Sequence, residues 1–216
     1  MISRSRGRRS LHRRAAPSSV ALAALVIVIG GLAVACGSGS FDPTGPCTAD
    51  GRAAGAYPDL EAEVVTTFDA RPPDTVDSGR NCSAAALGTL KEGGIDEMRF
   101  AGATWKLGRS SGMTIAVLEA DGLDAEQAAA FYEAGARAGR NVESVEVNPI
   151  RIGAEEGTRI DALNKESFQT VVVAPRGTNR VTVVLVASFI REVNTREAHD
   201  GVVTDAIAAA FGEPLG

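Results

Sequence analysis

A serine, an aspartate and a histidine occur in this sequence in an order that hydrolases use. The segment Gly108-Arg109-Ser110-Ser111-Gly112 matches the pattern G-x-S-x-G, and Asp161 and His199 follow it. In a hydrolase the serine stands on a sharp turn from a strand into a helix, where the base and the acid activate it. Here Met113–Leu118 follows the motif and predicts a strand. A hairpin loop therefore explains the motif, and a serine hydrolase using Ser110, Asp161 and His199 is the alternative.

Metal and cofactor chemistry lack the residues that they need. His199 is the only histidine after residue 35, and its place near the start of the predicted last helix suits an exposed position. The acidic pairs Asp96-Glu97 and Glu155-Glu156 lack the loop spacing of a calcium site, so we interpret them as solvated charge. The sequence has no Walker loop, no dinucleotide-binding glycine pattern and no C-x-x-C motif. It therefore predicts no metal and no cofactor.

The first 35 residues differ from the rest of the chain. Six arginines and no acidic residue precede Val20–Ala35, a run of sixteen residues without a polar side chain. A membrane-spanning helix needs about 20 apolar residues, so this run suits the hydrophobic region of a secretory signal peptide. The basic residues keep their end in the cytoplasm, which directs the rest of the chain across the membrane.

The apolar run ends in a short motif around a cysteine. Leu32-Ala33-Val34-Ala35-Cys36, followed by Gly37-Ser38-Gly39-Ser40, resembles the lipobox of bacterial prolipoproteins. The resemblance implies cleavage between Ala35 and Cys36 and attachment of lipid to Cys36, which holds the protein on the extracytoplasmic face of the cell membrane. Cleavage without lipidation and an uncleaved signal anchor are the alternatives. Arg8-Arg9 leaves a twin-arginine export route open beside the general one.

The other two cysteines form the next candidate pair. If Cys36 carries lipid, Cys47 and Cys82 remain, and a compartment outside the cytoplasm favours a disulfide between them. A bridge across 35 positions constrains the unfolded chain enough to stabilise the fold by about 3–4 kcal/mol. Two buried free thiols are the alternative.

The sequence divides into a signal peptide over residues 1–35, a flexible tether over 36–46 and one soluble domain over 47–216. We expect an α+β fold, in which an antiparallel or mixed sheet of about five to seven strands carries two or three helices on one face. The domain loosely resembles PsbP-type and other small secreted α+β lipoprotein domains in this order of elements, with no shared motif. The expected helices cover 83–92, 124–138 and 195–211, and the clearest strands cover 98–105, 113–118, 168–174 and 180–188.

Charge limits the functions open to this domain. The whole chain has a net charge of −5, but without the six N-terminal arginines 16 basic residues face 27 acidic ones, a net charge of −11. Such a domain has no basic surface for nucleic acid, and its charge cannot hold it on an anionic membrane. We therefore expect a non-catalytic, lipid-anchored domain that binds an envelope protein or a small apolar ligand. A purely structural envelope protein is a further alternative.

Overall fold

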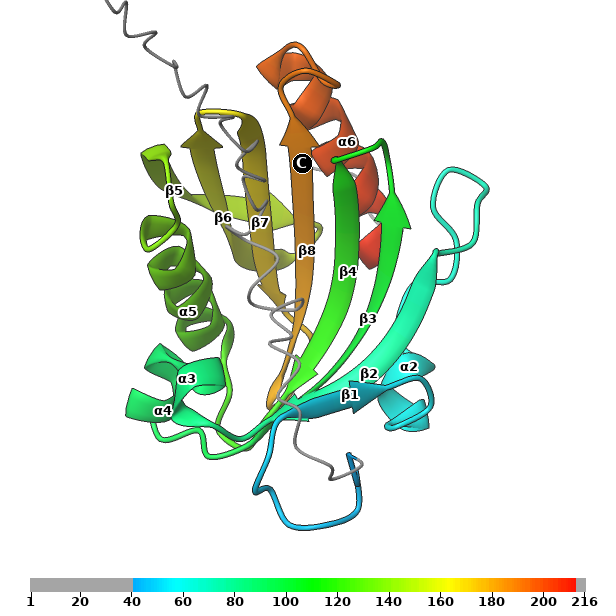
Figure 1. Ribbon diagram of the computed structural model, residues 1–216, viewed down its shortest axis with the longest axis vertical. Coiled ribbons are helices and arrows are strands. Elements are labelled where there is room, and N and C mark those ends of the chain that lie inside the picture. Colours follow the sequence, from blue (N-terminus) through cyan, green and yellow to red (C-terminus); the bar gives the residue numbers. More distant parts are fainter. Residues whose placement is uncertain (1–40, 213–216) are drawn as a thin grey trace, which may run out of the picture.

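The computed structural model describes residues 41–212. One sheet of eight strands forms its centre, in the order β1-β2-β3-β4-β8-β7-β6-β5, and every neighbouring pair is antiparallel (Figure 1). The strands are β1 (Gly51–Ala53), β2 (Thr75–Asn81), β3 (Met98–Lys106), β4 (Gly112–Glu119), β5 (Val142–Ile152), β6 (Glu155–Asn164), β7 (Ser167–Pro175) and β8 (Arg180–Phe189). The antiparallel sheet with helices packed on it is confirmed, but it is larger than the expected five to seven strands.

The strands that sequence patterns marked weakly or not at all lie toward the two edges of the sheet. β1 and β2 have few apolar residues, and Gly79 in β2 approaches β1 so closely that a Cβ would lie 2.2 Å from the carbonyl oxygen of Gly51. At the other edge, β5 runs through Pro149 without a break, and an edge strand is where a sheet accommodates proline. These strands contain polar residues, glycine or proline at positions where an apolar alternation would have marked them.

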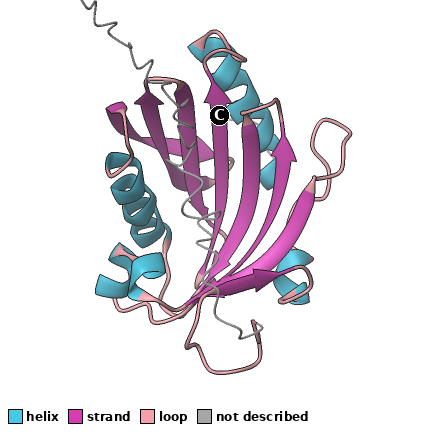
Figure 2. Cartoon of the chain, in the orientation of Figure 1, coloured by secondary structure: helices cyan, strands magenta, loops and turns pink. Residues whose placement is uncertain are grey.

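Five helices accompany the sheet in the described part of the chain, and Figure 2 shows that only two are long. They are α2 (Pro58–Glu61), α3 (Ala84–Leu87), α4 (Thr89–Glu92), α5 (Ala125–Arg137) and α6 (Arg196–Phe211). A capping box of Asp124 and Gln127 begins α5, and the Thr195 side chain caps α6, where the sequence predicts these two helices to begin. The helix expected over 83–92 is instead two single turns, because Gly88 between them has a φ of +50°.

Helices cover both faces of the sheet, not one as expected. α5 packs with α3 and α4 on one face, where Phe131 lies in a core with Leu118 and Val183. α6 and α2 lie on the other face (Figure 1), where Ile207 lies in a core with Ile115 and Val184. Neighbouring residues of a strand point to opposite faces, so a strand that is apolar at nearly every position is buried on both. The nearly unbroken apolar runs of β7 and β8 therefore indicate burial on both faces.

Candidate functional site

The G-x-S-x-G motif forms the loop between β3 and β4 and surrounds a carboxylate from another part of the chain. Glu192, just after β8, accepts hydrogen bonds from the N–H groups of Ser110 and Ser111 at 2.9 and 3.0 Å, and from Ser111 Oγ at 2.7 Å. These bonds, led by the Ser111 hydroxyl, hold the pKa of the Glu192 carboxyl below its usual value. The loop thus uses its serines and backbone N–H groups to bind Glu192, which accounts for the motif as part of a hairpin.

His199 lies in a buried line of polar side chains between α6 and the sheet. Its Nε2 is 2.8 Å from Thr170 Oγ1, and its Nδ1 is 2.8 Å from Ser188 Oγ. Thr170 donates its only hydroxyl proton to Asp161 Oδ1 at 2.5 Å, so it must accept from Nε2–H. Nδ1 of the neutral ring then accepts from Ser188. The hydrogen bonds therefore run from Ser188 through His199 and Thr170 to Asp161.

The three residues of the alternative hydrolase are not brought together in this fold. Both ring nitrogens of His199 are hydrogen-bonded to residues other than Ser110, and Asp161 reaches the ring only through Thr170. His199 is 0% exposed, so the expectation of an exposed histidine is wrong. Its spacing from Val203 and Ala206 places it on the buried face of α6, a helical periodicity that the sequence already contains.

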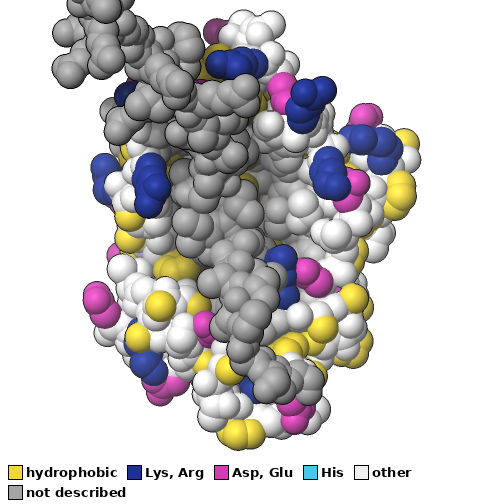
Figure 3. Space-filling model, viewed as in Figure 1, with side chains coloured by type: hydrophobic (Ala, Val, Ile, Leu, Met, Phe, Trp, Pro, Cys, Tyr) yellow, Lys and Arg dark blue, Asp and Glu magenta, His cyan; other side chains and the backbone are white. Residues whose placement is uncertain are grey.

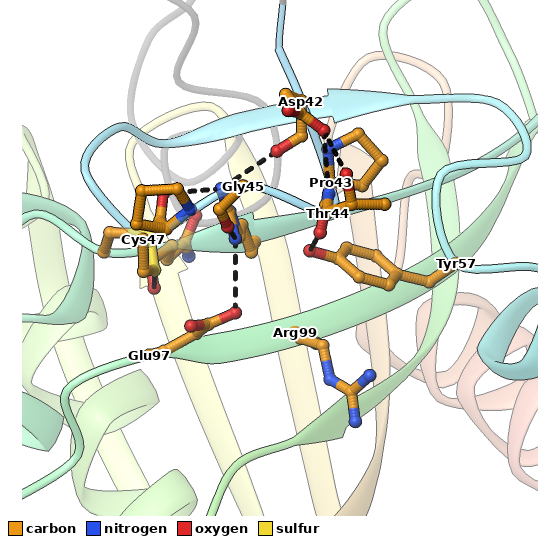
Figure 4. A network of polar contacts seen from close by, with 12 residues as sticks. Asp42, Pro43, Thr44, Gly45, Cys47, Tyr57, Glu97 and Arg99 are labelled. Carbon is orange, nitrogen blue, oxygen red and sulfur yellow. Dashed lines mark hydrogen bonds and ion pairs between the residues drawn. A yellow bond between two sulfur atoms is a disulfide. The ribbon is translucent and has the colours of Figure 1, made fainter.

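Residues 41–46, which the sequence assigned to the tether, are held against the domain by one arginine. Arg80 of β2 is 5% exposed. Its Nη1 donates to the carbonyl oxygen of Gly45 at 2.7 Å, and its Nη2 donates to those of Asp42 and Pro46 at 3.0 and 2.9 Å (Figure 4). We call Phe41–Pro46 with Arg80 the N-terminal clamp.

Aromatic contacts and the disulfide complete the attachment of this segment. The Phe41 ring lies 5.8 Å from the Arg80 guanidinium and packs over Gly51, where a Cβ would come within 2.3 Å of the ring. Tyr57 Oη donates to the carbonyl oxygen of Pro43 at 3.3 Å. Cys47 and Cys82 form the predicted disulfide, with their Cα atoms 5.5 Å apart.

Removing this disulfide lowers the stability of the fold. Replacing both Cys47 and Cys82 by serine is expected to lower the free energy of unfolding by about 3–4 kcal/mol, because the unfolded chain regains the freedom of a 35-residue loop. Urea unfolding with and without reductant measures the effect. A wild-type midpoint that reductant does not move would contradict the prediction, and the double variant, which reductant cannot affect, is the control.

A row of charged side chains crosses the sheet beside the clamp. Four residues lie directly opposite one another on β2, β3, β4 and β8: Arg80, Arg99, Glu119 and Arg180. Glu119 pairs with Arg99 through one oxygen and with Arg180 through the other. Glu63, after α2, pairs with Arg180 at 2.5 Å and with Arg176 at 3.1 Å. The resulting ion-pair network, Arg99–Glu119–Arg180–Glu63–Arg176, has three positive and two negative charges.

The ion-pair network and the clamp border one pocket of about 910 Å³, which we call the arginine pocket. Most of its lining falls into three groups: the clamp residues Pro43, Thr44 and Gly45, the basic residues Arg80, Arg99, Arg176 and Arg180, and the acidic residues Asp96, Glu97, Glu119 and Asp121. This volume lies within the range of small-molecule sites. The face of the domain seen in Figure 3 has basic and acidic side chains interspersed.

Sequence reasoning did not find this pocket. The sequence did predict the strands at whose ends three of the charged residues lie, namely Arg99, Glu119 and Arg180. Their position at strand ends was the one sign of the pocket in the sequence. Hairpin pairing of β3 with β4 places Arg99 opposite Glu119, but the pairing of β4 with β8 joins segments about 60 residues apart, and no local pattern fixes it.

Cys36 and Ala35 lie outside the described residues. Within residues 41–212, no helix is long and apolar enough to cross a bilayer, and no three His, Cys, Asp or Glu residues are grouped to hold a metal ion. Comparisons of the chain with protein-family models, curated proteins and solved structures found no match.

Proposed function

We propose that this chain is a lipid-anchored, extracytoplasmic binding domain without catalytic activity, and that the arginine pocket is its binding site. The lipobox resemblance supports the anchor at Cys36. The geometry around Ser110, His199 and Asp161 favours a structural role for all three. The loop that contains Ser110 binds the Glu192 carboxylate, and both ring nitrogens of His199 are hydrogen-bonded to buried hydroxyl groups. The described pocket is lined by charged groups, so it suits a charged ligand better than the apolar ligand expected from the sequence.

The single observation that carries this proposal is the N-terminal clamp. Arg80 holds the chain from Asp42 onward, so only residues 37–40 separate Cys36 from the clamp. An extended chain covers about 3.5 Å per residue, which keeps Cys36 within about 18 Å of Phe41. A lipid on Cys36 therefore places the arginine pocket, whose lining includes Pro43–Gly45, beside the membrane surface.

Metabolic labelling with an alkynyl fatty acid tests the anchor. Labelled protein is expected in the membrane fraction, and the label is expected to disappear in Cys36→Ser. The variant with serine at both Cys47 and Cys82 is the matched control and keeps the label, because these cysteines form the disulfide. Label that survives Cys36→Ser would show that the anchor is placed wrongly.

A further inference from the structure

The arginine pocket has unused hydrogen-bond donors as well as charge. In the ion-pair network Arg180 uses Nε, Nη1 and Nη2 on Glu119 and Glu63, and Arg176 uses all three nitrogens on Glu63 and Thr182. Arg99 differs, because only its Nη2 has a hydrogen-bond partner, Glu119, among residues 41–212. Arg99 thus keeps Nε–H and Nη1–H for a ligand.

Arg99 is also held in place for such a role. Its guanidinium lies 5.5 Å from the centre of the Tyr57 ring, and Glu119 fixes its Nη2. The side chain is 38% exposed, and in Figure 4 its guanidinium group points away from the labelled clamp residues. On the clamp side, Arg80 Nε is buried without a hydrogen-bond partner among the described residues. Both arginines line the same pocket, but Arg80 Nε is enclosed, so the donors left for a ligand there come from Arg99.

Planar guanidinium groups with free N–H donors favour phosphate, which they bind in a two-pronged manner. The network has one more positive than negative charge, and Arg80 beside it is paired with Glu97 at 3.7 Å, so one negative charge on a ligand balances the network. The exposed Asp121 lines the same pocket, as does Asp96, which is paired with Lys91. The charge of Asp121 disfavours a second negative charge and favours an ammonium group close to the phosphate.

We infer that the arginine pocket binds the headgroup of a zwitterionic phospholipid, a phosphate diester carrying an ammonium group, as in phosphoethanolamine. The choice of a lipid as the source of this group rests on the proposed anchor, which holds the pocket beside the bilayer. There the headgroups are present at high local concentration, so a weak intrinsic affinity is enough for occupancy. Arg99 holds the phosphate, and Asp121 faces the ammonium group.

Isothermal titration of the protein purified from membranes in non-ionic detergent tests this inference with three soluble probes. We expect glycerophosphoethanolamine to bind at least about tenfold more tightly than glycerophosphoglycerol or inorganic phosphate. Arg99→Ala is expected to weaken binding of glycerophosphoethanolamine by at least about tenfold, as the loss of a two-pronged charged contact implies. Asp121→Asn is expected to remove the preference for the ammonium-bearing probe without abolishing phosphate binding. Arg137→Ala on α5, an exposed arginine paired with Glu133, is the matched control and leaves binding unchanged.

Three results would overturn the inference. They are no binding of glycerophosphoethanolamine, equal affinity of the wild type and Arg99→Ala for it, and inorganic phosphate binding as tightly as the headgroup. If Arg99→Ala does not fold, Arg99→Lys keeps the charge but loses the planar donors, and it must still weaken binding. Loss of headgroup binding with fatty-acid labelling intact rejects this inference alone, while loss of labelling with binding intact rejects the anchor alone.

Discussion

Arg80→Ala is expected to release residues 41–46 from the domain and to lower the free energy of unfolding by about 3 kcal/mol. The substitution leaves the carbonyl oxygens of Asp42, Gly45 and Pro46 without their charged donor, and it removes the buried surface that Phe41 packs against. Hydrogen bonds to charged groups contribute about 1.5–3 kcal/mol each, and those lost together are not additive. Urea unfolding measures the loss of stability.

Hydrogen exchange and limited proteolysis locate the change in Arg80→Ala. Faster exchange and new cleavage are expected in residues 41–46, while Cys47 stays fixed by the disulfide. Arg137→Ala removes an exposed arginine instead and is expected to stay within about 0.5 kcal/mol of the wild type. If Arg80→Ala behaved like this control, the N-terminal clamp would have no part in holding the segment.

The second large effect is a loss of stability in mild acid. Burial lowers the pKa of His199 to about 4 in the folded protein, against about 6.5 in the unfolded chain. Between these values the unfolded chain binds a proton that the folded chain does not, so stability is complete above pH 6.5 and is lost as the pH falls toward 4. The loss reaches up to about 3 kcal/mol.

The physical cause is the direction of the hydrogen bonds around the ring. Nδ1 accepts from Ser188 while Nε2 donates to Thr170, and a proton on Nδ1 removes the acceptor of the first bond, so the Ser188 hydroxyl must turn away and a charge is left in a buried site. Asp161 does not cancel the effect: burial opposes its ionisation, but Arg159 and Thr170 outweigh burial and keep its pKa below the usual value. Its own contribution is therefore lost only at still lower pH, and in the same direction.

Unfolding free energies measured from pH 7 to pH 4 check this prediction. His199→Gln keeps a donor toward Thr170 but cannot titrate. It is expected to be less stable than the wild type at pH 7 and to show a flatter dependence on pH over this range. No other histidine lies after residue 35, so the comparison isolates one group. Equal stability of the wild type at pH 7 and pH 4.5 would contradict the assignment of a buried neutral ring.

The sequence predicts well what local chemistry determines. The caps at Asp124 and Thr195 and the apolar runs of β7 and β8 identified two helices and the central strands, because each depends on residues close in the chain. The disulfide followed from counting cysteines. The same apolar runs also indicated burial on both faces of the sheet, but the interpretation with helices on one face did not use that signal.

The sequence does not predict what distant pairings create. The arginine pocket needs β2, β3, β4 and β8 in one register, the segment after α2 for Glu63, and the clamp for its lining. Arg80 alone shows why: it lies in a strand without apolar alternation and binds carbonyl groups 34 to 38 residues earlier. No spacing within the sequence marks such a contact.

The distance from the arginine pocket to the membrane is the most direct test of the proposal that the lipid anchor holds this pocket beside the bilayer. Energy transfer would be measured to acceptor headgroups in vesicles that hold the anchored protein. The donor fluorophore would be placed at position 178, which lines the pocket, or at position 109, in the β3–β4 loop. The β3–β4 loop lies at the other end of a strand of about 30 Å. We expect much stronger transfer from position 178, with the difference reduced in Arg80→Ala. Equal transfer from both positions, or stronger transfer from position 109, would contradict it.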